Sequence, residues 1–279
     1  VRALDTIRFA IQTHRGCYGE CNFCAIAVHQ GRTVVERSEE SILREAEKLA
    51  RHKDFKGIIQ DVGGPTANMY GIECERKKRR GACRERRCLT PDICRHMPVS
   101  HKKQIRLLRK LRKIPNVKKV FIGSGIRYDL ILQDKEFGHQ YLDEIIKHHI
   151  SGQLKIAPEH SETQILRLMG KPGRDLLKQF VLLFRQANAA TGKKQFLTCY
   201  FIAAYPGCTI RDMQALKEHV HDILKFTPEQ VQIFTPSPST FATLMYYTEL
   251  DCIDGKSVFV EKDIKQKIRQ KDILITPCI

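Results

Sequence analysis

Apolar residues follow two different periods along the chain, and these periods alternate. Residues 7–13 and 57–62 are short, apolar, β-prone runs, and each of them predicts a strand. Between them, the segment after Ser38 places Ile42 and Ala46 on one face of a helix, with acidic residues in its first turn. A strand, a helix and a strand in this order predict a right-handed parallel unit.

The same alternation continues as far as residue 234. Further strands are expected at 117–122, 153–157, 196–203 and 231–234, and further helices at 101–113, 137–149, 174–190 and 209–226. A capping box at 161–164 predicts the start of another helix, which ends at Gly170. Six strand–helix units predict an α/β fold, a partial (β/α)6 TIM-like barrel with its site at the carboxyl ends of the strands.

The domain organisation follows from where this alternation is interrupted. The core is expected at 1–250, with an insertion at about 66–100 after the second strand and the start of a carboxyl-terminal extension at 251–279. Because the chain starts at Val1 and stops inside an apolar stretch, we expect a piece of a longer protein. Neither a signal peptide nor an apolar run of membrane-spanning length is recognisable, and eleven cysteines fit thiols in a reducing cytoplasm better than disulfides.

The net charge of +17 is concentrated in one segment. Residues 76–119 contain 18 Lys or Arg against two acids, Glu85 and Asp92, whereas the rest of the chain carries 30 bases and 29 acids. Such a segment can bind nucleic-acid phosphates, but it lacks an aromatic stacking platform and any RNA-binding signature. A solvated face is the alternative, and the sequence leaves both interpretations open.

Three cysteines, Cys17, Cys21 and Cys24, lie within eight residues of one another, directly after the first predicted strand. Crowded thiolates select zinc, copper(I) or an iron–sulfur cluster over hard cations. Three thiolates leave one iron of a four-iron cluster without a protein ligand, so that iron is free to bind a substrate. The alternative is a structural zinc site completed by His14 or His29.

The spacing Cys-x3-Cys-x2-Cys, with Phe23 before the last cysteine, resembles the signature of the radical S-adenosylmethionine (SAM) superfamily. The resemblance implies that Cys17, Cys21 and Cys24 hold a 4Fe-4S cluster whose open iron chelates SAM. It also implies reductive cleavage of SAM to a 5′-deoxyadenosyl radical, which abstracts hydrogen from a substrate that the sequence does not name. A flavodoxin or ferredoxin is the implied electron donor.

Two strand-end segments carry the same resemblance and imply contacts to SAM. Gly63 and Gly64 are similar to a Gly-Gly-acid sequence that touches the SAM amino group, but Pro65 replaces the acid, so only the backbone role is implied. Glu159 lies in a strand-end segment followed by Leu-Met-Gly-Lys-Pro at 168–172, which implies a contact to the ribose or adenine.

Three more residues complete the predicted SAM site. Ser124 and Arg127 occupy positions of polar contacts to the ribose or carboxylate, and Phe23 belongs to the cysteine motif. Together with residues 61–70 and 234–248, these segments make the chain resemble the core of the YgiQ-type radical SAM proteins. The reaction of that family is not established, so the resemblance implies cofactors and no substrate.

The insertion contains four more cysteines, which are Cys74, Cys83, Cys88 and Cys94. They can supply a second iron–sulfur cluster or a tetrahedral zinc site, and the interleaved Lys and Arg favour thiolates. Free thiols in a surface loop are the alternative. Of the isolated cysteines Cys199, Cys208 and Cys252, which are expected to pack in the core, Cys208 is the one to test as a radical or proton donor.

These predictions describe an enzyme that generates a radical from SAM. The alternative, from a different class of protein, is a non-catalytic module that is stabilised by zinc or a cluster and binds nucleic acid.

Overall fold

Parallel strands form the centre of the fold, for which the computed structural model describes residue 4 and residues 7–277. These strands are β1 (Ala10–Gln12), β4 (Ile58–Ile59), β5 (Asp61–Gly63), β6 (Lys119–Val120), β7 (Gln153–Glu159), β8 (Phe196–Ala203) and β9 (Gln230–Ile233). β1 pairs with β5, β4 pairs with β6, and β7, β8 and β9 form one sheet in that order; every one of these pairings is parallel. The antiparallel pair β2 (His14–Arg15) and β3 (Val35–Glu36) lies beside the first strand.

Hydrogen bonds between the short sheets keep the strands in chain order. The Val62 N–H donates to the Phe121 carbonyl at 2.9 Å, and the Phe121 N–H donates to the Ile59 carbonyl at 2.9 Å. A parallel bridge between Ile126 and Ile156 continues this order toward β7. Strand segments that follow one another in the sequence therefore lie side by side, and their carboxyl ends meet at one edge.

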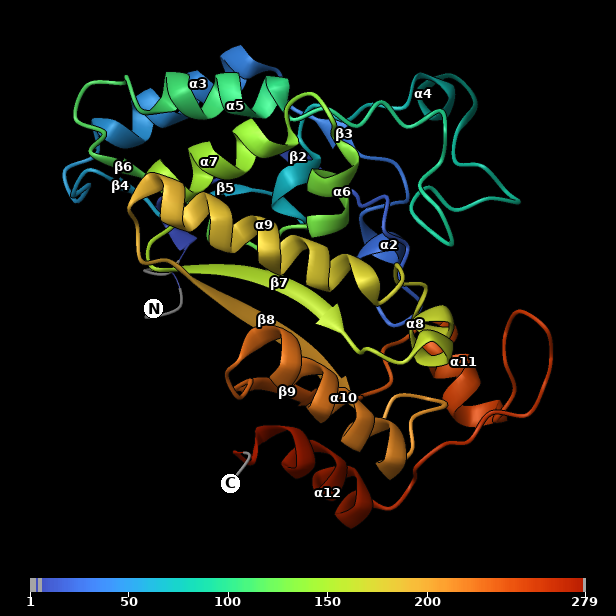
Figure 1. Ribbon diagram of the computed structural model, residues 1–279. Coiled ribbons are helices and arrows are strands. Elements are labelled where there is room, and N and C mark those ends of the chain that lie inside the picture. Colours follow the sequence, from blue (N-terminus) through green and yellow to red (C-terminus); the bar gives the residue numbers. More distant parts are fainter. Residues whose placement is uncertain (1–3, 5–6, 278–279) are drawn as a thin grey trace.

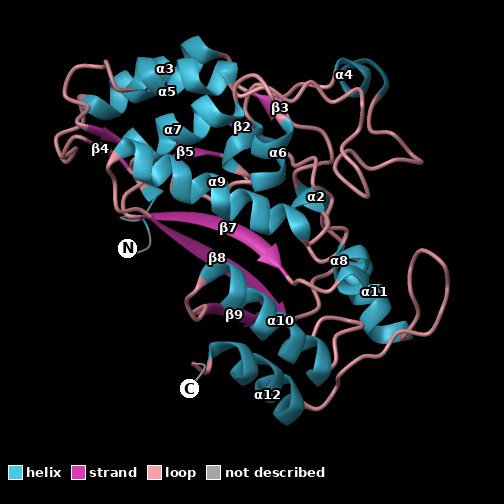
Figure 2. Cartoon of the chain, viewed as in Figure 1, coloured by secondary structure: helices cyan, strands magenta, loops and turns pink. Residues whose placement is uncertain are grey.

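Helices connect the strands and cover them on the outside (Figure 1, Figure 2). They are α2 (Ile26–His29), α3 (Glu39–Ala50), the 3-10 turn η1 (Ala67–Met69), α4 (Glu75–Arg80), α5 (Lys102–Leu111), α6 (Tyr128–Gln133), α7 (Gly138–His148), α8 (Thr163–Met169), α9 (Asp175–Thr191), α10 (Ile210–Leu224), α11 (Phe241–Thr248) and α12 (Ile264–Ile275). In Figure 1, α9 crosses in front of β7, α10 lies below β8, and α12 lies below β8 and β9. The segment around α4 projects away from the strands as long loops (Figure 2).

Helix ends show where local sequence signals hold and where they fail. The Ser38 side chain accepts from the Ser41 N–H at the start of α3, and α8 ends at Gly170 with φ +66°, both as predicted. The predicted capping box at 161–164 is wrong, because α8 starts after Glu162 and its cap makes no side-chain hydrogen bond. The Ser161 hydroxyl donates to the Glu162 carboxylate instead, at 3.2 Å.

The strands differ in length from the apolar runs that predict them. The run at 57–62 divides into β4 and β5, and only Lys119 and Val120 of the run at 117–122 are strand. β7 continues two residues beyond the predicted end, to Glu159. The sequence pattern did not predict α4, α6, α11 and α12, because these helices are short or lie outside the strand–helix alternation.

Two hydrophobic clusters stabilise the fold. The larger one lies between the strands and their helices and contains, for example, Ile11, Ile59, Leu154 and Phe201. The smaller one lies under the insertion and joins residues of the cysteine loop, the insertion and α6: Tyr18, Val34, Met69, Ile72, Cys74, Cys88, Leu89, Met97 and Leu130. The insertion is therefore packed against the cysteine loop.

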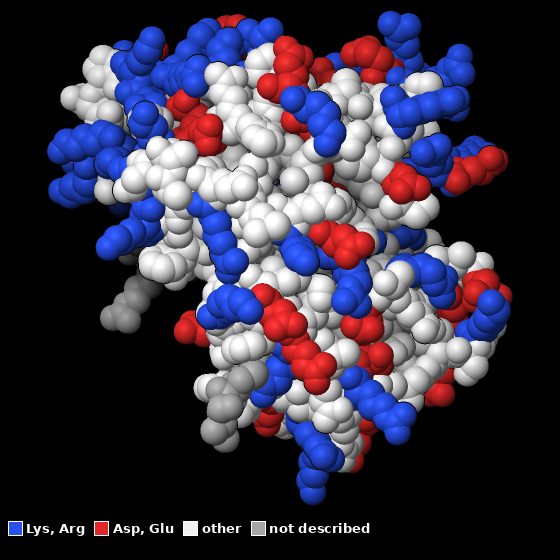
Figure 3. Space-filling model, viewed as in Figure 1, with Lys and Arg blue, Asp and Glu red and all other residues white. Residues whose placement is uncertain are grey.

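Acids from distant parts of the sequence neutralise the basic helix α5. Arg106 and Lys110 both pair with Glu39 of α3, and Arg109 pairs with Glu144 of α7 at 2.7 Å. Lysine and arginine side chains still gather on the surface where α3 and α5 lie (Figure 3). Part of the charge that the sequence concentrates at 76–119 is thus compensated by acids that pair with α5.

The segment after residue 250 packs on the same body as the strands. The Gln270 side chain of α12 is buried, accepts from the Ala204 N–H at 2.9 Å and donates to the Cys208 carbonyl at 3.3 Å. The predicted boundary between a core at 1–250 and an extension at 251–279 stays a prediction. Within residue 4 and residues 7–277, none of the helices has the length and apolar character needed to cross a membrane.

Candidate active site

The cysteine loop follows the first strands, at their carboxyl ends, as the sequence predicts. Cys17, Cys21 and Cys24 are all partly buried and free of disulfides. The Gly19 N–H points to Cys17 Sγ at 3.3 Å, and Thr66 Oγ1 lies 3.6 Å from the same sulfur. Three thiols on one short loop therefore face a common region of the molecule.

The second half of this loop is fixed by the end of α8. The Asn22 N–H donates to the Met169 carbonyl at 2.8 Å, and the Asn22 side chain donates to the Leu168 carbonyl at 2.7 Å. These carbonyls belong to the last turn of the helix, where no intrahelical donor remains. The loop thus completes the hydrogen bonding of α8, and α8 fixes the position of the thiols.

The surroundings of Gly19 show how closely the sulfurs of the loop and Arg127 approach one another. A Cβ at this position would lie 3.3 Å from Cys17 Sγ, 3.6 Å from Cys21 Sγ and 2.9 Å from an Arg127 guanidinium nitrogen. Both sulfurs therefore lie close to Gly19, where an added methyl group would press on Arg127 and Cys17. Three soft donors on one short loop fit an iron–sulfur cluster.

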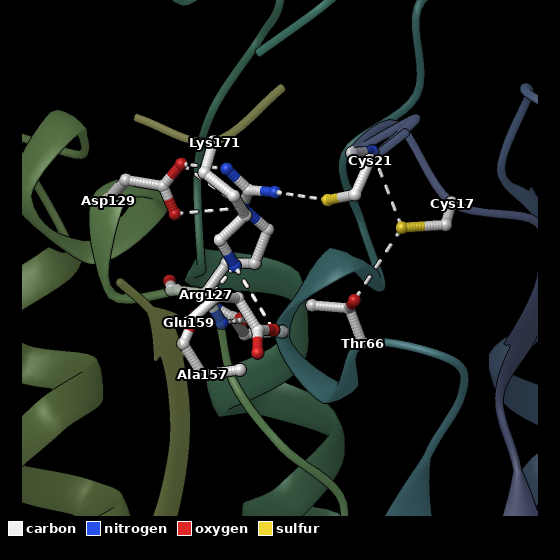
Figure 4. A network of polar contacts seen from close by, with 10 residues as sticks. Cys17, Cys21, Thr66, Arg127, Asp129, Ala157, Glu159 and Lys171 are labelled. Atoms are coloured by element: carbon white, nitrogen blue, oxygen red, sulfur yellow. Dashed lines mark hydrogen bonds and ion pairs between the residues drawn. The ribbon is translucent and has the colours of Figure 1, made fainter. Parts of the chain in front are cut away.

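Arg127 lies against this loop and outside the neighbouring cavity described below. Its guanidinium donates to the Asp129 carboxylate at 2.9 Å and approaches Cys21 Sγ at 3.9 Å (Figure 4). Burial would raise the pKa of Asp129, but the charge of Arg127 outweighs burial and keeps that pKa below its usual value. A buried positive charge beside Cys21 favours negative charge on a cluster at this position.

A cavity of about 580 Å³ opens at the carboxyl ends of the strands, next to the loop. Four of the six residues predicted to contact SAM line it: Phe23, Gly64, Ser124 and Glu159. Tyr200 and Gln232 line the same cavity from β8 and β9. Its volume lies in the usual range for cofactor pockets, about 300–1,000 Å³.

Glu159 is held in an unusual backbone conformation at the wall of this cavity. Its φ is +69°, a left-handed value that costs a non-glycine residue roughly 1–3 kcal/mol and is frequent at functional sites. Burial raises the pKa of its carboxyl group, although Lys171, whose Nζ lies 3.7 Å away, opposes that rise. Figure 4 shows Lys171 between Glu159 and the Ala157 carbonyl, to which it donates at 2.6 Å.

The two predicted glycines have different surroundings. The Gly63 carbonyl already accepts from the Thr13 N–H at 2.7 Å, and Gly63 does not line the cavity. A Cβ on Gly64 would lie 2.6 Å from the His14 ring, so packing alone requires a glycine there. Burial lowers the pKa of His14 to about 4, and its ring lies under Gly64.

Asp61 is a site residue to which the sequence analysis gave no role. Its carboxylate accepts from the Gly123 N–H at 2.8 Å and the Ser124 N–H at 3.1 Å, and it also accepts from the Ser124 hydroxyl. The turn after β6 is therefore held on β5 by one side chain. The sequence offered one signal for this contact: an acid, Asp61, at the start of a strand and a Gly-Ser-Gly turn after the next predicted strand.

The four cysteines of the insertion line a different cavity, of about 380 Å³. In the described part of the chain, no group of three or more His, Cys, Asp or Glu side chains is placed to hold a metal ion as it stands. His14 and His29, the predicted alternative ligands, complete no such group; His29 is exposed on α2. A 4Fe-4S cluster binds each thiolate to a different iron, so its ligands surround a volume and do not meet at one point.

Two of the three isolated cysteines, Cys199 and Cys208, are buried and Cys252 is half-buried. Cys208 Sγ lies 3.5 Å from His160 Nε2, and neither residue lines the cavity at the strand ends. Burial raises the pKa of Cys208, to a value at which the thiol stays protonated. The suggestion that Cys208 serves as a radical or proton donor stays a prediction.

Sequence comparison identifies the family. The model of the radical SAM superfamily matches residues 11–220, which include the cysteine loop and every strand up to β8. The chain belongs to the radical SAM superfamily. The predicted α/β fold and the predicted cofactors, a 4Fe-4S cluster and SAM, agree with this membership.

Curated relatives are similar over almost the whole chain. A UPF0313 protein of Fusobacterium nucleatum is 60% identical over 274 residues, and one of Methanosarcina mazei is 49% identical over 274 residues. Both alignments cover 98% of this chain, but only 48% and 43% of those relatives. The chain thus spans less than half the length of either relative, and the names of these relatives state no activity.

Solved structures support the fold. The radical SAM methyltransferase TsrM of Kitasatospora setae, with cobalamin and a 4Fe-4S cluster bound, has a TM-score of 0.56 at 14% identity, covering 95% of this chain and 46% of that chain. The cobalamin-dependent SAM radical enzyme OxsB has a TM-score of 0.52 at 19% identity, covering 86% of this chain and 29% of that chain. At these identities the similarity shows the fold and nothing about the substrate.

Proposed function

We propose that this chain is the catalytic core of a radical SAM enzyme, with Cys17, Cys21 and Cys24 as the ligands of its 4Fe-4S cluster. The observation that carries the proposal is the juxtaposition of the three-thiol loop with the cavity lined by Phe23 and Glu159. When bound, the cluster supplies the electron that cleaves SAM to methionine and a 5′-deoxyadenosyl radical. The substrate of that radical is not part of the proposal.

The residues around the cavity have distinct roles in this proposal. Phe23 offers an apolar face beside the thiols, and its ring packs edge-on against Tyr205 with centroids 6.2 Å apart. Glu159 accepts hydrogen bonds from the SAM ribose, and Lys171 holds the carboxylate in place. Ser124 is oriented by Asp61 and presents its backbone to the ligand. Together these groups position SAM and exclude water.

The finer architecture is also a proposal. We assign the parallel strands to a partial (β/α)6 barrel of the radical SAM type, with the segment at about 66–100 as its insertion; the bridging hydrogen bonds around Phe121 and Ile126 support a continuous strand order. A low-potential one-electron donor of the flavodoxin or ferredoxin type would reduce the cluster.

The comparisons do not support the alternative of a non-catalytic nucleic-acid-binding module. Nucleic-acid binding through residues 76–119 stays a prediction. Exposed arginines of this segment include Arg76, Arg79, Arg80, Arg84, Arg86 and Arg95. By contrast, Arg106, Arg109 and Lys110 of α5 pair with acids.

Anaerobic reconstitution with iron and sulfide tests the cluster assignment. The chain is expected to show the visible charge-transfer absorption of an iron–thiolate cluster, and SAM is expected to change the electron paramagnetic resonance spectrum of the reduced cluster. In the variant Cys17→Ser/Cys21→Ser/Cys24→Ser the SAM-dependent change should disappear, whereas the control Cys252→Ser should retain it. A SAM-dependent spectrum that survives in the triple variant would refute the assignment.

A further inference from the structure

The insertion places four thiols around one cavity. Cys74, Cys83, Cys88 and Cys94 all line the cavity of about 380 Å³, and none of them forms a disulfide. Cys74 and Cys88 are only 7% and 5% exposed, and the other two are half-buried. Free cysteines in a mobile surface loop would not be expected to line one cavity together.

Contacts to the rest of the molecule fix the backbone at these thiols. The Cys74 N–H donates to the Tyr18 hydroxyl at 3.3 Å, and Arg32 donates to the Cys83 carbonyl at 2.6 Å. The Cys94 N–H donates to the Cys88 carbonyl at 2.8 Å, which joins the last two cysteines of the set. The segment between α4 and α5 has no regular secondary structure, so these contacts position the thiols.

Positive charge surrounds the cavity. Five basic side chains line it, which are Arg76, Lys77, Arg84, Arg86 and Arg95, against a single acid, Glu85. A cluster with four thiolate ligands carries net negative charge, which this lining balances.

We propose that Cys74, Cys83, Cys88 and Cys94 bind a second 4Fe-4S cluster. A zinc ion would draw four sulfurs to about 2.3 Å from a single point and leave no cavity between them. A cubane places each sulfur on a separate iron, so it suits four thiols that line a cavity and do not meet at one point. With four protein ligands, this site leaves no iron open to SAM, in contrast to the three-thiol loop.

The second site adjoins the first. Tyr18, between Cys17 and Gly19 in sequence, belongs to the same hydrophobic cluster as Cys74 and Cys88, and Cys17 packs against that cluster. Lys77, which lines the second cavity, is buried and pairs with Glu20 of the cysteine loop at 3.3 Å. The insertion therefore packs directly against the cysteine loop that is proposed to bind the first cluster.

Iron and sulfide counts on reconstituted variants test this proposal. The parent chain should bind about eight irons and eight sulfides, because each 4Fe-4S cluster holds four of each. The variant Cys17→Ser/Cys21→Ser/Cys24→Ser should retain about half of both, with a reduced-cluster spectrum that SAM does not change. The variant Cys74→Ser/Cys83→Ser/Cys88→Ser/Cys94→Ser should retain the other half, with the SAM-dependent spectrum.

The counts separate failure of this inference from failure of the proposed function. If the variant Cys17→Ser/Cys21→Ser/Cys24→Ser binds no iron or sulfide, or binds one zinc ion instead, the proposal of a second cluster is refuted. This conclusion does not depend on what the cysteine loop binds. A quadruple variant without iron contradicts the first site instead. Because Cys74 and Cys88 are buried, the double variant Cys83→Ser/Cys94→Ser tests the site without replacing a buried residue. Cys252→Ser is its control. A double variant that binds as much iron as the parent chain also overturns the proposal.

Discussion

At the scale of single residues, the site depends on small groups that keep space open or hold charge. Gly19 lies close to two sulfurs, Glu159 has a left-handed backbone at the cavity wall, and Asp61 holds the Ser124 turn. The proposed cluster ligands Cys17, Cys21 and Cys24 were predicted from their spacing and the resemblance that it carries. Their partners Asp61, Arg127, Asp129 and Lys171 were not assigned these contacts, because each contact joins segments that are distant in sequence.

Gly19→Ala tests the space at the first cluster. The added methyl group would lie 2.9 Å from an Arg127 nitrogen and 3.3 Å from Cys17 Sγ, so the variant should lose most of the iron bound by the cysteine loop. The matched control is Gly173→Ala, where an added Cβ would meet no atom within 4 Å. Iron analysis of both variants in the background of the quadruple cysteine variant measures the effect; equal iron contents would contradict the proposed role of Gly19.

Glu159→Gln tests the cavity as the SAM site. Loss of a charged acceptor should weaken SAM binding by about 10- to 100-fold, the equivalent of about 1.5–3 kcal/mol. Glu162→Gln, three residues further along and outside the cavity, is the control. Equilibrium binding of SAM to the anaerobic, reconstituted chain is the measurement, and unchanged affinity in Glu159→Gln would place SAM elsewhere.

The Arg127–Asp129 pair is expected to tune the cluster potential. Replacing both in Arg127→Gln/Asp129→Asn removes the positive charge 3.9 Å from Cys21 Sγ, which should lower the reduction potential by on the order of tens of millivolts. The control Arg167→Gln/Asp251→Asn removes another ion pair, which joins α8 to the segment after α11. Redox titration followed by electron paramagnetic resonance compares them, and a rise in potential would refute the electrostatic argument.

At the scale of helices and strands, the longer strands were predictable because β-prone residues with a buried side chain at every second position leave a signal over several residues. β7, β8 and β9 therefore lie within a few residues of their predicted positions. The insertion was not predictable in detail, because its conformation depends on contacts to distant residues, such as the ion pair between Lys77 and Glu20, more than on local secondary structure. The sequence also overstated the free positive charge of α5, because the acids that pair with this helix lie on α3 and α7.

The contact between α5 and α7 predicts an acid dependence of stability. Burial would raise the pKa of Glu144, but His149 and Arg109 outweigh burial and lower it to about 2. Because the folded pKa lies below the unfolded value near 4.5, this carboxylate stabilises the fold above about pH 4.5, and the stabilisation is lost as pH falls toward 2. Its size is at most about 3 kcal/mol.

Denaturant unfolding of Glu144→Gln measures this contribution. The variant should be less stable than the parent at pH 7, and the difference should shrink as the pH falls through the acid range. Glu47→Gln, at an exposed position of α3, is the control and should match the parent at every pH. A difference between Glu144→Gln and the parent that is constant with pH would contradict the role of ionised Glu144.

At the scale of the whole molecule, the fold brings the ends of five strands, β5 to β9, together with one helix end and the cysteine loop to a single edge. Residues from 23 to 232 meet at the cavity there, although no local segment supplies more than a few of them. Family membership and fold were accessible from the sequence, since the motif and the alternation of elements are repeated signals. The substrate was not, because the residues that would select it share no periodic pattern.

The formation of 5′-deoxyadenosine tests the central claim most directly. The reconstituted chain is incubated anaerobically with SAM and dithionite, and the nucleoside is quantified chromatographically beside Cys21→Ser and the control Cys252→Ser. We expect reductant-dependent 5′-deoxyadenosine and methionine from the parent and the control, and none from Cys21→Ser. A cluster-loaded parent chain that forms no 5′-deoxyadenosine, or a Cys21→Ser variant that forms as much as the parent, would contradict the account.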